Sequence, residues 1–255
     1  MSSTYSAVDL SSDPQEAADW QDHINAWPAV AAYKRAMATR LGPARPILDV
    51  GSGTGGDLVA LGPGAVGVEP STVMCDRARA RGAVACRGDA HALPFPDQRF
   101  AGVRADRVLQ HLAHPVTGLG ELVRVLQPGG RLVVADPDQG SLVIEVPGVD
   151  QRLTDAVRRR RRERQYRNPT LARRVPGLLH DLGLEDIGVE GFALTITDPD
   201  LAFGLAHWVR LGAQAGEGFG ADDVARWDAG VERSRQAPGF VYTVTYLVVS
   251  ARRPR

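Results

Sequence analysis

The sequence predicts an α/β protein with a mostly parallel sheet and helices on both of its faces. Two observations predict this class. Between residues 46 and 136, short apolar runs alternate with segments of helical periodicity, which is typical of strands joined by crossover helices. The segment PILDVGSGTGGDL has the pattern of a strand, a glycine turn and a helix start.

Strands are expected at about residues 46–50, 65–69, 83–86, 101–106 and 131–136, and helices at about 55–61, 71–81 and 115–126. Ser71 or Thr72 can cap the second of these helices. Pro128-Gly129-Gly130 is expected to end the third helix and lead into the fifth strand. The β-branched and aromatic segments 184–196 and 240–249 are expected to be the sixth and seventh strands.

The N-terminal segment, residues 1–42, has a helical pattern after a polar, Ser-rich start. Asp13 followed by Pro14 predicts a helix start, with the aspartate as N-cap and the proline in the first turn. Pro28 is expected to divide the rest of the segment into two helices, because proline disrupts a helix interior.

Composition argues against several classes of protein. The 255 residues are 44% hydrophobic, and 30 basic residues balance 30 acidic ones. A dedicated nucleic-acid binder needs excess positive charge, so we expect no nucleic-acid partner. We see no apolar run near the ~18 residues of a membrane span and no signal-peptide pattern. Cys75 and Cys86 have no metal-ligand spacing, so we expect reduced thiols, no metal site and a cytoplasmic protein.

Two carboxylates narrow the range of cofactors that the glycine segment is expected to bind. Gly51, Gly53 and Gly56 fit GxGxxG, which alone is a weak sign of a nucleotide cofactor. Asp49 precedes the first glycine by two residues and would repel a pyrophosphate, so it favours a cofactor with a cationic group. Glu69 ends the next apolar run, eighteen residues after Gly51, where a carboxylate can accept both hydroxyls of a ribose.

Four segments in this order, DVGSGTGGD, VGVEPS, GDAHALPFPDQRFAGV and LQPGGRLVVADPD, resemble class I S-adenosylmethionine-dependent methyltransferases of the small-molecule, quinone-methyltransferase-like type. The resemblance covers roughly residues 40 to 140. It implies a Rossmann-like, seven-stranded sheet in the order 3-2-1-4-5-7-6, with the last two strands antiparallel. It also implies a helical cover formed by residues 1–42 and a core formed by residues 43–255, with cap insertions at about 140–182 and 198–238.

The resemblance implies S-adenosylmethionine as cofactor and S-adenosylhomocysteine as product. The expected cofactor-binding residues are Asp49, Gly51, Ser52, Gly53, Gly55, Glu69, Pro70, Asp89, Ala90 and Arg107. Asp49 would balance the cationic end of the cofactor, the glycine turn would follow its methionine portion, and Glu69 would hold the ribose. Asp89 and the N–H of Ala90 would face the adenine, although Asp89 can alternatively cap a local turn.

The segment RVLQHL follows the fourth strand and is expected beside the methyl-donor pocket, because ligands of open α/β sheets bind beyond the carboxyl ends of the strands. Here His111 is the candidate general base, since an unperturbed imidazole has a pKa of about 6.5. Methyl transfer does not always need a base, so the alternative is a histidine that positions the loop or the cofactor.

Further candidates lie in the cover and in the aromatic insertion. They are Tyr5, Trp20, His23, His207 and Trp208. The first three can face the ligand from the cover, although Trp20 and Trp27 can equally pack a helix onto the sheet. The insertion predicts an apolar acceptor pocket, and the alternative is a lid that packs only onto the core.

Five consecutive arginines, Arg158–Arg162, cannot share one helix face, because successive residues lie about 100° apart. We expect most of them in solvent, on a helix that ends near Arg167, with pairs between Asp155 and Arg159 and between Glu163 and Arg167. The alternative is an anion site for an acidic or phosphorylated substrate. A second helix is expected from residue 169 or 170 to residue 182.

The predicted function is methyl transfer to a small, hydrophobic acceptor at O, N or C, such as a quinone, a polyketide or another secondary metabolite. Three alternatives remain. The GxGxxG pattern also fits an NAD-dependent oxidoreductase, and the fold also occurs in proteins that bind the cofactor without transfer or that catalyse other chemistry, such as a cyclisation. The sequence indicates no particular oligomeric state.

Overall fold

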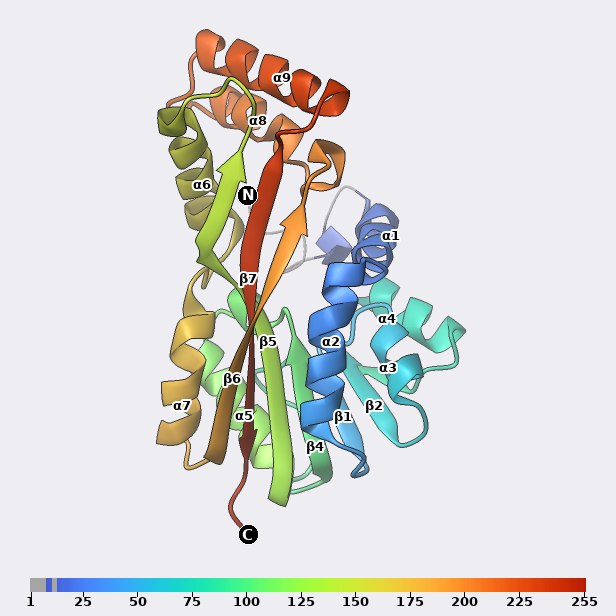
Figure 1. The fold of residues 1–255 in the computed structure, drawn as a ribbon. Coiled ribbons are helices and arrows are strands. Elements are labelled where there is room, and N and C mark those ends of the chain that lie inside the picture. The colour runs from blue at the N-terminus through green and yellow to red at the C-terminus, as the bar shows by residue number, and fades with distance from the viewer. Residues whose placement is uncertain (1–7, 11–12) are drawn as a thin grey trace.

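The structure is a computed structural model that describes residues 8–10 and 13–255. Its centre is a seven-stranded sheet in the order β3-β2-β1-β4-β5-β7-β6, as predicted (Figure 1). The strands are β1 (Ile47–Val50), β2 (Ala65–Glu69), β3 (Ala85–Arg87), β4 (Phe100–Asp106), β5 (Leu126–Glu145), β6 (Glu185–Ile196) and β7 (Val241–Arg252). The helices are α1 (Pro14–Asn25), α2 (Pro28–Leu41), α3 (Gly56–Leu61), α4 (Thr72–Ala80), α5 (Pro115–Val125), α6 (Gln151–Gln165), α7 (Val175–Asp181), α8 (Trp208–Gln214) and α9 (Ala221–Gln236).

Strands β1 to β5 are parallel, and β7 runs antiparallel to both β5 and β6. The sheet therefore matches the predicted Rossmann-like arrangement. The carboxyl ends of the parallel strands lie toward α6, α8 and α9, which stand above this edge of the sheet (Figure 1). We call these three helices, with the 3-10 turns η5 (Pro199–Leu201) and η6 (Leu205–His207), the cap.

The helix starts follow local capping chemistry, as predicted. The Asp13 carboxylate accepts hydrogen bonds from the N–H groups of Gln15 and Glu16, and Pro14 is the first residue of α1. Pro28 begins α2, so the N-terminal segment consists of two helices. At α4, the Ser71 hydroxyl accepts from the N–H of Met74.

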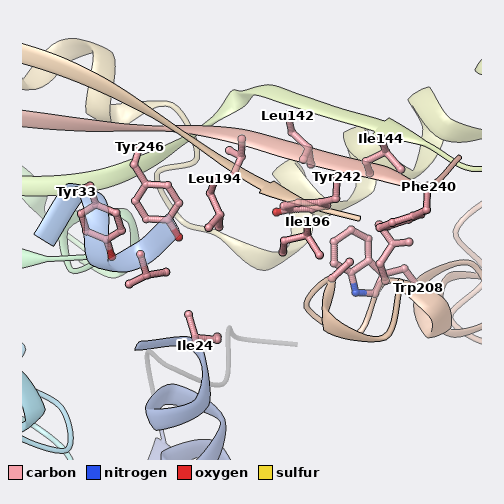
Figure 2. Packing of buried hydrophobic residues seen from close by; sticks show 14 of the residues in the cluster. Ile24, Tyr33, Leu142, Ile144, Leu194, Ile196, Trp208, Phe240, Tyr242 and Tyr246 are labelled. Carbon is pink, nitrogen blue, oxygen red and sulfur yellow. The ribbon is translucent and has the colours of Figure 1, made fainter. Parts of the chain in front are cut away.

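Different helices cover the two faces of the sheet. On one face, Tyr33 of α2 stacks on Tyr246 of β7 with ring centroids 4.7 Å apart. This cluster continues along β6 and β7 to Trp208 and Phe240 in and beside the cap (Figure 2). On the other face, α5 packs against β4 and β5, and α7 packs against β6 and β7. One apolar cluster thus joins the N-terminal helices, the sheet and the cap.

The chain between residues 137 and 167 differs from the prediction. We expected the fifth strand to end near residue 136 and a helix to follow within residues 140–167, but β5 continues to Glu145. The extension persists because Val143 and Ile144 pair with Thr243 and Tyr242 of β7, after a register shift that follows Asp138. The helix α6 starts only at Gln151 and ends at Gln165.

The second expected helix of this insertion is divided into a 3-10 turn, η4 (Leu171–Arg174), and α7. Cys75 is buried, Cys86 is half-buried, and both are free thiols, as predicted. Within residues 8–10 and 13–255, none of the helices is long and apolar enough to cross a membrane.

Candidate functional site

The glycine turn after β1 has a backbone shape that only glycine adopts without strain. Gly51, Gly53 and Gly55 all have positive φ, and Gly55 is the N-cap of α3 at φ +80°. A Cβ on Gly55 would lie 2.6 Å from the Cβ and 2.8 Å from the Cα of Ala78 in α4. The turn therefore packs directly on α4, and this packing brings the start of α3 to the carboxyl end of β1.

Helix α1 lies over this turn. A Cβ on Gly53 would be 2.1 Å from Nε2 of Gln21, so the Gln21 side chain rests on the glycine backbone. Asp22 of α1 accepts hydrogen bonds from the Thr54 hydroxyl and, at 2.9 Å, from Nη1 of Arg81 after α4. Arg77 of α4 pairs with Asp19 at 2.5 Å. The N-terminal helix is thus fixed to both the turn and α4 by polar contacts.

Glu69 lies at the carboxyl end of β2 and is buried. Its Oε2 accepts from the N–H of Gly53 and its Oε1 from the N–H of Ser71, both at 3.0 Å. Burial raises the pKa of Glu69, and the two N–H groups oppose that rise. Each oxygen accepts one bond in a group that can accept about four, so the carboxylate can take further donors. The hydroxyl of Ser52, in the same turn, is buried and has no hydrogen-bond partner among the described residues.

Asp49 belongs to a buried ionic network that the sequence analysis did not identify. Its Oδ1 lies 3.1 Å from Nε of Arg104 on β4, and Nη2 of Arg104 lies 2.8 Å from Asp57 at the start of α3. Lys34 of α2 contacts Asp57 at 2.7 Å and Asp106 at 3.3 Å. The signal for this network in the sequence is weak: it is the pair of charged residues, Arg104 and Asp106, at the end of an otherwise apolar strand.

The network sets opposite pKa shifts on two of its acids. Burial raises the pKa of Asp49 to about 7, although the adjacent Arg104 charge opposes the rise. Burial also tends to raise the pKa of Asp57, but the charges of Arg104 and Lys34 outweigh burial and lower this pKa to about 2. Asp57 therefore keeps its charge at neutral pH, whereas burial makes the ionisation of Asp49 less favourable, and a further cation nearby would favour it.

Arg107 stands next to this network, at φ +59°. Its Nη2 donates to Oδ1 of Asn25 at the end of α1, and its Nε lies 3.8 Å from Asp106. With Asp49 and Gly51, these residues line a hollow that has room for about one water molecule. The structure thus brings Asp49, the glycine turn and Arg107 together, as predicted.

Asp89 follows β3 and forms a local turn. Its Oδ1 accepts from the N–H of His91 at 2.9 Å and contacts Nδ1 of His91 at 2.6 Å. These bonds lower its pKa. The side chain is 67% exposed, so the turn does not withdraw the carboxylate from solvent. Ala90 beside it is buried, and the carbonyl of Pro70 accepts from Nε of Arg87.

His111 lies in the 3-10 turn η3 (Leu109–His111) after β4. Asp136 of β5 holds this turn by accepting from the N–H groups of Leu109 and Gln110. The His111 ring is 5.8 Å from the ring of Tyr166, which follows α6. Burial, with the nearby charges of Arg107 and Arg167, lowers the pKa of His111 to about 4. The imidazole is therefore neutral at physiological pH.

The predicted cover and acceptor residues lie in different surroundings. Trp20 stacks on His23 at 5.4 Å, and both contact Trp27, which in turn packs at 5.5 Å on Phe203 of the cap. Trp208 is buried, and its Nε1 donates to the carbonyl of Phe203 at 3.1 Å. His207 is exposed, beside Asp200 of the same insertion, and Tyr5 lies outside the described residues.

The arginine run is mostly at the surface, as predicted, but one of its members is buried, and neither expected pair, Asp155 with Arg159 or Glu163 with Arg167, is present among the described residues. Arg161 is only 2% exposed and lies inside the cap. The expected pair of Asp155 with Arg159 does not form, because Asp155 contacts Arg158 at 2.9 Å instead. Arg160 pairs with Glu217, from the loop after α8. Tertiary neighbours, which spacing along one helix does not reveal, decide the burial of Arg161 and the pairing of Arg160.

Comparison with known proteins identifies the family. The family profile described as "Methyltransferase domain" matches residues 48–134. An uncharacterized 37.1 kDa protein in transposon TN4556 of Streptomyces fradiae is 32% identical over 249 residues, which are 91% of this chain and 70% of that protein. The demethylmenaquinone methyltransferase of Mycobacterium sp. (strain JLS) is 37% identical over 102 residues, 39% of this chain and 44% of that enzyme.

Solved structures share the fold. A structure described as "a putative methyltransferase" from Bacillus halodurans C-125 matches with a TM-score of 0.60 at 20% identity, over 88% of this chain and 98% of that one. The cyclase SpnF has a TM-score of 0.55 at 25% identity, over 88% of this chain and 81% of its own. With its glycine turn, its strand order and these relatives, the chain belongs to the class I S-adenosylmethionine-dependent methyltransferases.

Proposed function

We propose that this methyltransferase transfers a methyl group from S-adenosylmethionine to a small, hydrophobic acceptor. The observation that carries the proposal is the buried Glu69 carboxylate, which is fixed by two backbone N–H groups beside a glycine turn without side chains. A carboxylate with unused acceptor capacity suits the two hydroxyls of a ribose. The glycines of the turn carry no Cβ, and this suits a ligand that must lie close to the backbone once the Gln21 side chain has moved away.

The other cofactor contacts are assigned to residues around this centre. The backbone of Gly51, Ser52, Gly53 and Gly55 follows the methionine portion, and Asp49 and Arg107 face its charged end. Pro70, Asp89 and Ala90 flank the adenine. S-adenosylmethionine, when bound, supplies an electrophilic methyl group on a cationic sulfur. Asp49, with a pKa raised to about 7, gains charge when a cation approaches, which favours a sulfonium or ammonium group over a second anion.

Helix α1 acts as the cover in this proposal. Gln21 occupies the space over Gly53, so a ligand on the glycine turn displaces that side chain. Trp20 and His23 of the same helix stack together and reach Trp27, which contacts the cap. Closure of α1 over the ligand would exclude water and hold the two reactants together, and positioning of this kind supplies much of the rate enhancement in such a transfer.

We assign His111 the role of accepting a hydrogen bond from the hydroxyl or amine group that receives the methyl group. Its imidazole is neutral at physiological pH, since its pKa is lowered to about 4. A neutral ring nitrogen can accept a hydrogen bond from an acceptor hydroxyl or amine and orient it. Such a low pKa makes His111 a weak base, so its larger contribution in this proposal is to position the acceptor atom.

The acceptor is proposed to be apolar and planar, in the range from quinones to polyketides. Support comes from the aromatic side chains Trp27, Phe203 and Trp208 between the cover and the cap, and from the partial match to a demethylmenaquinone methyltransferase. That match spans less than half of the relative. The acceptor atom, O, N or C, is left open by this support.

One alternative has a specific observation in its favour. The structural similarity to the cyclase SpnF is comparable with the similarity to methyltransferases, and the same fold can therefore accompany a reaction without methyl transfer. The reaction products distinguish a methyltransferase from a cyclase. A methyltransferase forms S-adenosylhomocysteine in equal amount with a product that is heavier by one methylene, whereas a cyclase leaves both the cofactor and the mass unchanged.

The experiment is a turnover assay with S-adenosylmethionine carrying a deuterated methyl group. The acceptors are a hydroxynaphthoquinone, a hydroxylated aromatic polyketide and an aromatic amine, and mass spectrometry follows the label. We expect transfer of the label to at least one acceptor, and a loss of at least tenfold in the His111→Gln variant. Tight cofactor binding without labelled product from any acceptor would instead favour the binding-only or cyclase alternatives.

A further inference from the structure

A guanidinium group is buried inside the cap. Arg161 of α6 is 2% exposed, and its Cζ atom lies over aromatic rings from three other segments. The ring centroids are 4.2 Å away for Trp208, 5.2 Å for Phe203, 5.4 Å for Tyr166 and 5.6 Å for Tyr242. The other arginines of the run have solvent or carboxylates as neighbours, so Arg161 is the exception that needs an explanation.

The polar partners of Arg161 are all uncharged. Nε lies 3.4 Å from Oε1 of Gln139, Nη1 donates to Oε1 of Gln165 at 2.9 Å, and Nη2 donates to the Tyr166 hydroxyl at 2.9 Å. Within the described part of the chain, no carboxylate lies within salt-bridge distance of this guanidinium. Cation–π contacts stabilise a buried arginine, but buried charges in proteins are normally paired with an opposite charge.

A second buried group at the same place lacks a partner. The hydroxyl of Tyr242, on β7, is buried beside the Arg161 guanidinium, and its proton has no acceptor among the residues that the structure describes. Tyr242 and Trp208 belong to the same apolar cluster (Figure 2). The Tyr242 phenol and the Arg161 guanidinium, which has no anion beside it, therefore lie together among aromatic rings. Their O–H and N–H groups are the hydrogen-bond donors that a carboxylate or phenolate requires.

This place is connected to the expected reaction centre. The Tyr166 hydroxyl accepts a hydrogen bond from Nη2 of Arg161, and the Tyr166 ring is 5.8 Å from the ring of His111. Asn168 fixes the two segments together, because its side chain donates to the carbonyls of Leu109 and Leu112 on either side of His111. A molecule held at Arg161 by one end would therefore extend past Tyr166 toward His111.

We propose that Arg161 is the anion-binding residue of the acceptor site, and that the acceptor carries an acidic group, a carboxylate or a phenolate, on a planar apolar body. The proposal rests on the function proposed above. When it binds, the acidic group takes the place of Gln165 and Tyr166 as hydrogen-bond acceptor for the Arg161 guanidinium. Both residues lie where α6 ends and the chain becomes extended. The rings of Phe203, Trp208 and Tyr242 contact the planar body.

The test measures binding of three carboxylates, acetate, benzoate and 2-naphthoate, each beside its neutral amide, to the full chain by calorimetry. Each titration is run with and without S-adenosylhomocysteine. The variants are Arg161→Gln and, as a matched control on the same helix, Arg160→Gln, whose side chain pairs with Glu217 from the loop after α8 and does not contact the aromatic rings around Arg161. We expect 2-naphthoate to bind the natural protein at least tenfold more tightly than 2-naphthamide. Arg161→Gln is expected to abolish that preference, and Arg160→Gln to retain it.

A stability measurement separates this role from a structural one. A charge without an anionic partner destabilises the ligand-free protein, so Arg161→Met is expected to keep or raise the melting temperature while it removes the carboxylate preference. Unfolding of Arg161→Met at lower temperature, together with an unchanged preference in Arg161→Gln, would overturn the proposal. So would the absence of a preference for all three carboxylates in the natural protein.

The same titrations distinguish the two proposals. Binding of S-adenosylhomocysteine without any carboxylate preference keeps the methyltransferase function and overturns the role of Arg161. A carboxylate preference that depends on Arg161, in a protein that does not bind S-adenosylhomocysteine, supports the anion site and contradicts the proposed function.

Discussion

The glycine turn beneath α1 and the aromatic interior of the cap are built in different ways. The turn depends on the shape of one short backbone segment, from Gly51 to Gly55, and two N–H groups hold the Glu69 carboxylate beside it. The cap interior depends on side chains from three regions that are far apart in the chain, residues 161–166, residues 203–208 and Tyr242, with Arg161 and Trp208 at the centre.

The difference shows which part of such a protein is free to vary. A turn with three positive φ angles tolerates few residue types, because only glycine adopts these angles without strain. An aromatic interior accepts other residues of similar volume, so it can change with the acceptor while the fold persists. We therefore expect substitutions in the turn to affect folding and cofactor binding together, and substitutions in the cap to affect acceptor binding alone.

The largest expected effect comes from Gly55→Ala in the turn. The new Cβ would stand at φ +80° and 2.8 Å from the backbone of Ala78, so we expect a loss of about 3–4 kcal/mol in the free energy of unfolding. Urea denaturation measures it. The control is Gly183→Ala, at φ +80° before β6 with open space around it, for which about 1 kcal/mol is expected. Equal losses at the two sites would show that packing on α4 contributes nothing.

Glu69→Gln separates binding from folding in the same region. It replaces a charged group with two acceptor oxygens by a neutral amide of the same shape, which can accept from only one of the N–H groups of Gly53 and Ser71. We expect the affinity for S-adenosylhomocysteine to fall by about 2–4 kcal/mol. Isothermal titration calorimetry measures the change. Asp76→Asn, an exposed acid on α4, serves as the control and should bind as the natural protein does. Natural affinity in Glu69→Gln would refute the ribose assignment.

His111, between the two regions, predicts an acid-sensitive stability. Its pKa is about 4 in the folded protein and about 6.5 when unfolded, so below pH 6.5 the unfolded chain binds the extra proton first. Stability should therefore fall as pH decreases from 6.5 to 4, by up to about 2–3 kcal/mol from this residue. Urea denaturation of the natural protein and of His111→Gln at several pH values isolates the contribution of His111 to the free energy of unfolding. Parallel pH profiles for the two proteins would contradict the lowered pKa.

The smallest effect concerns the contact of α1 with the turn. Asp22→Asn weakens the partly exposed pairs with Arg77 and Arg81, and the expected loss of unfolding free energy is at most about 1 kcal/mol. The release rate of S-adenosylhomocysteine should rise, because the cover opens more easily. Arg40→Gln, which removes an exposed pair with Glu190 on β6, is the control. An unchanged release rate would mean that α1 does not act as a cover.

The same comparison explains what the sequence could predict. The strand order, the capped helices and the placement of Asp49, Glu69 and Arg107 around one turn follow from local patterns and a known motif order. The buried position of Arg161 does not, because a run of five arginines reads as a solvated surface until the partners of α6 are known. Strand β5 was predicted too short for a similar reason, since its extension depends on pairing with β7, about a hundred residues later.

The most direct measurement is a thermal shift of the natural protein with S-adenosylmethionine, S-adenosylhomocysteine and NADH in parallel. A ligand at about 100 times its Kd adds about 2.7 kcal/mol to the stability, which corresponds to a rise of about 5–10 °C for a chain of this size. We predict this rise with the two sulfur-containing nucleosides and none with NADH. A rise with NADH alone, or with none of the three, would contradict the assignment of Asp49, Glu69 and the glycine turn to the methyl donor.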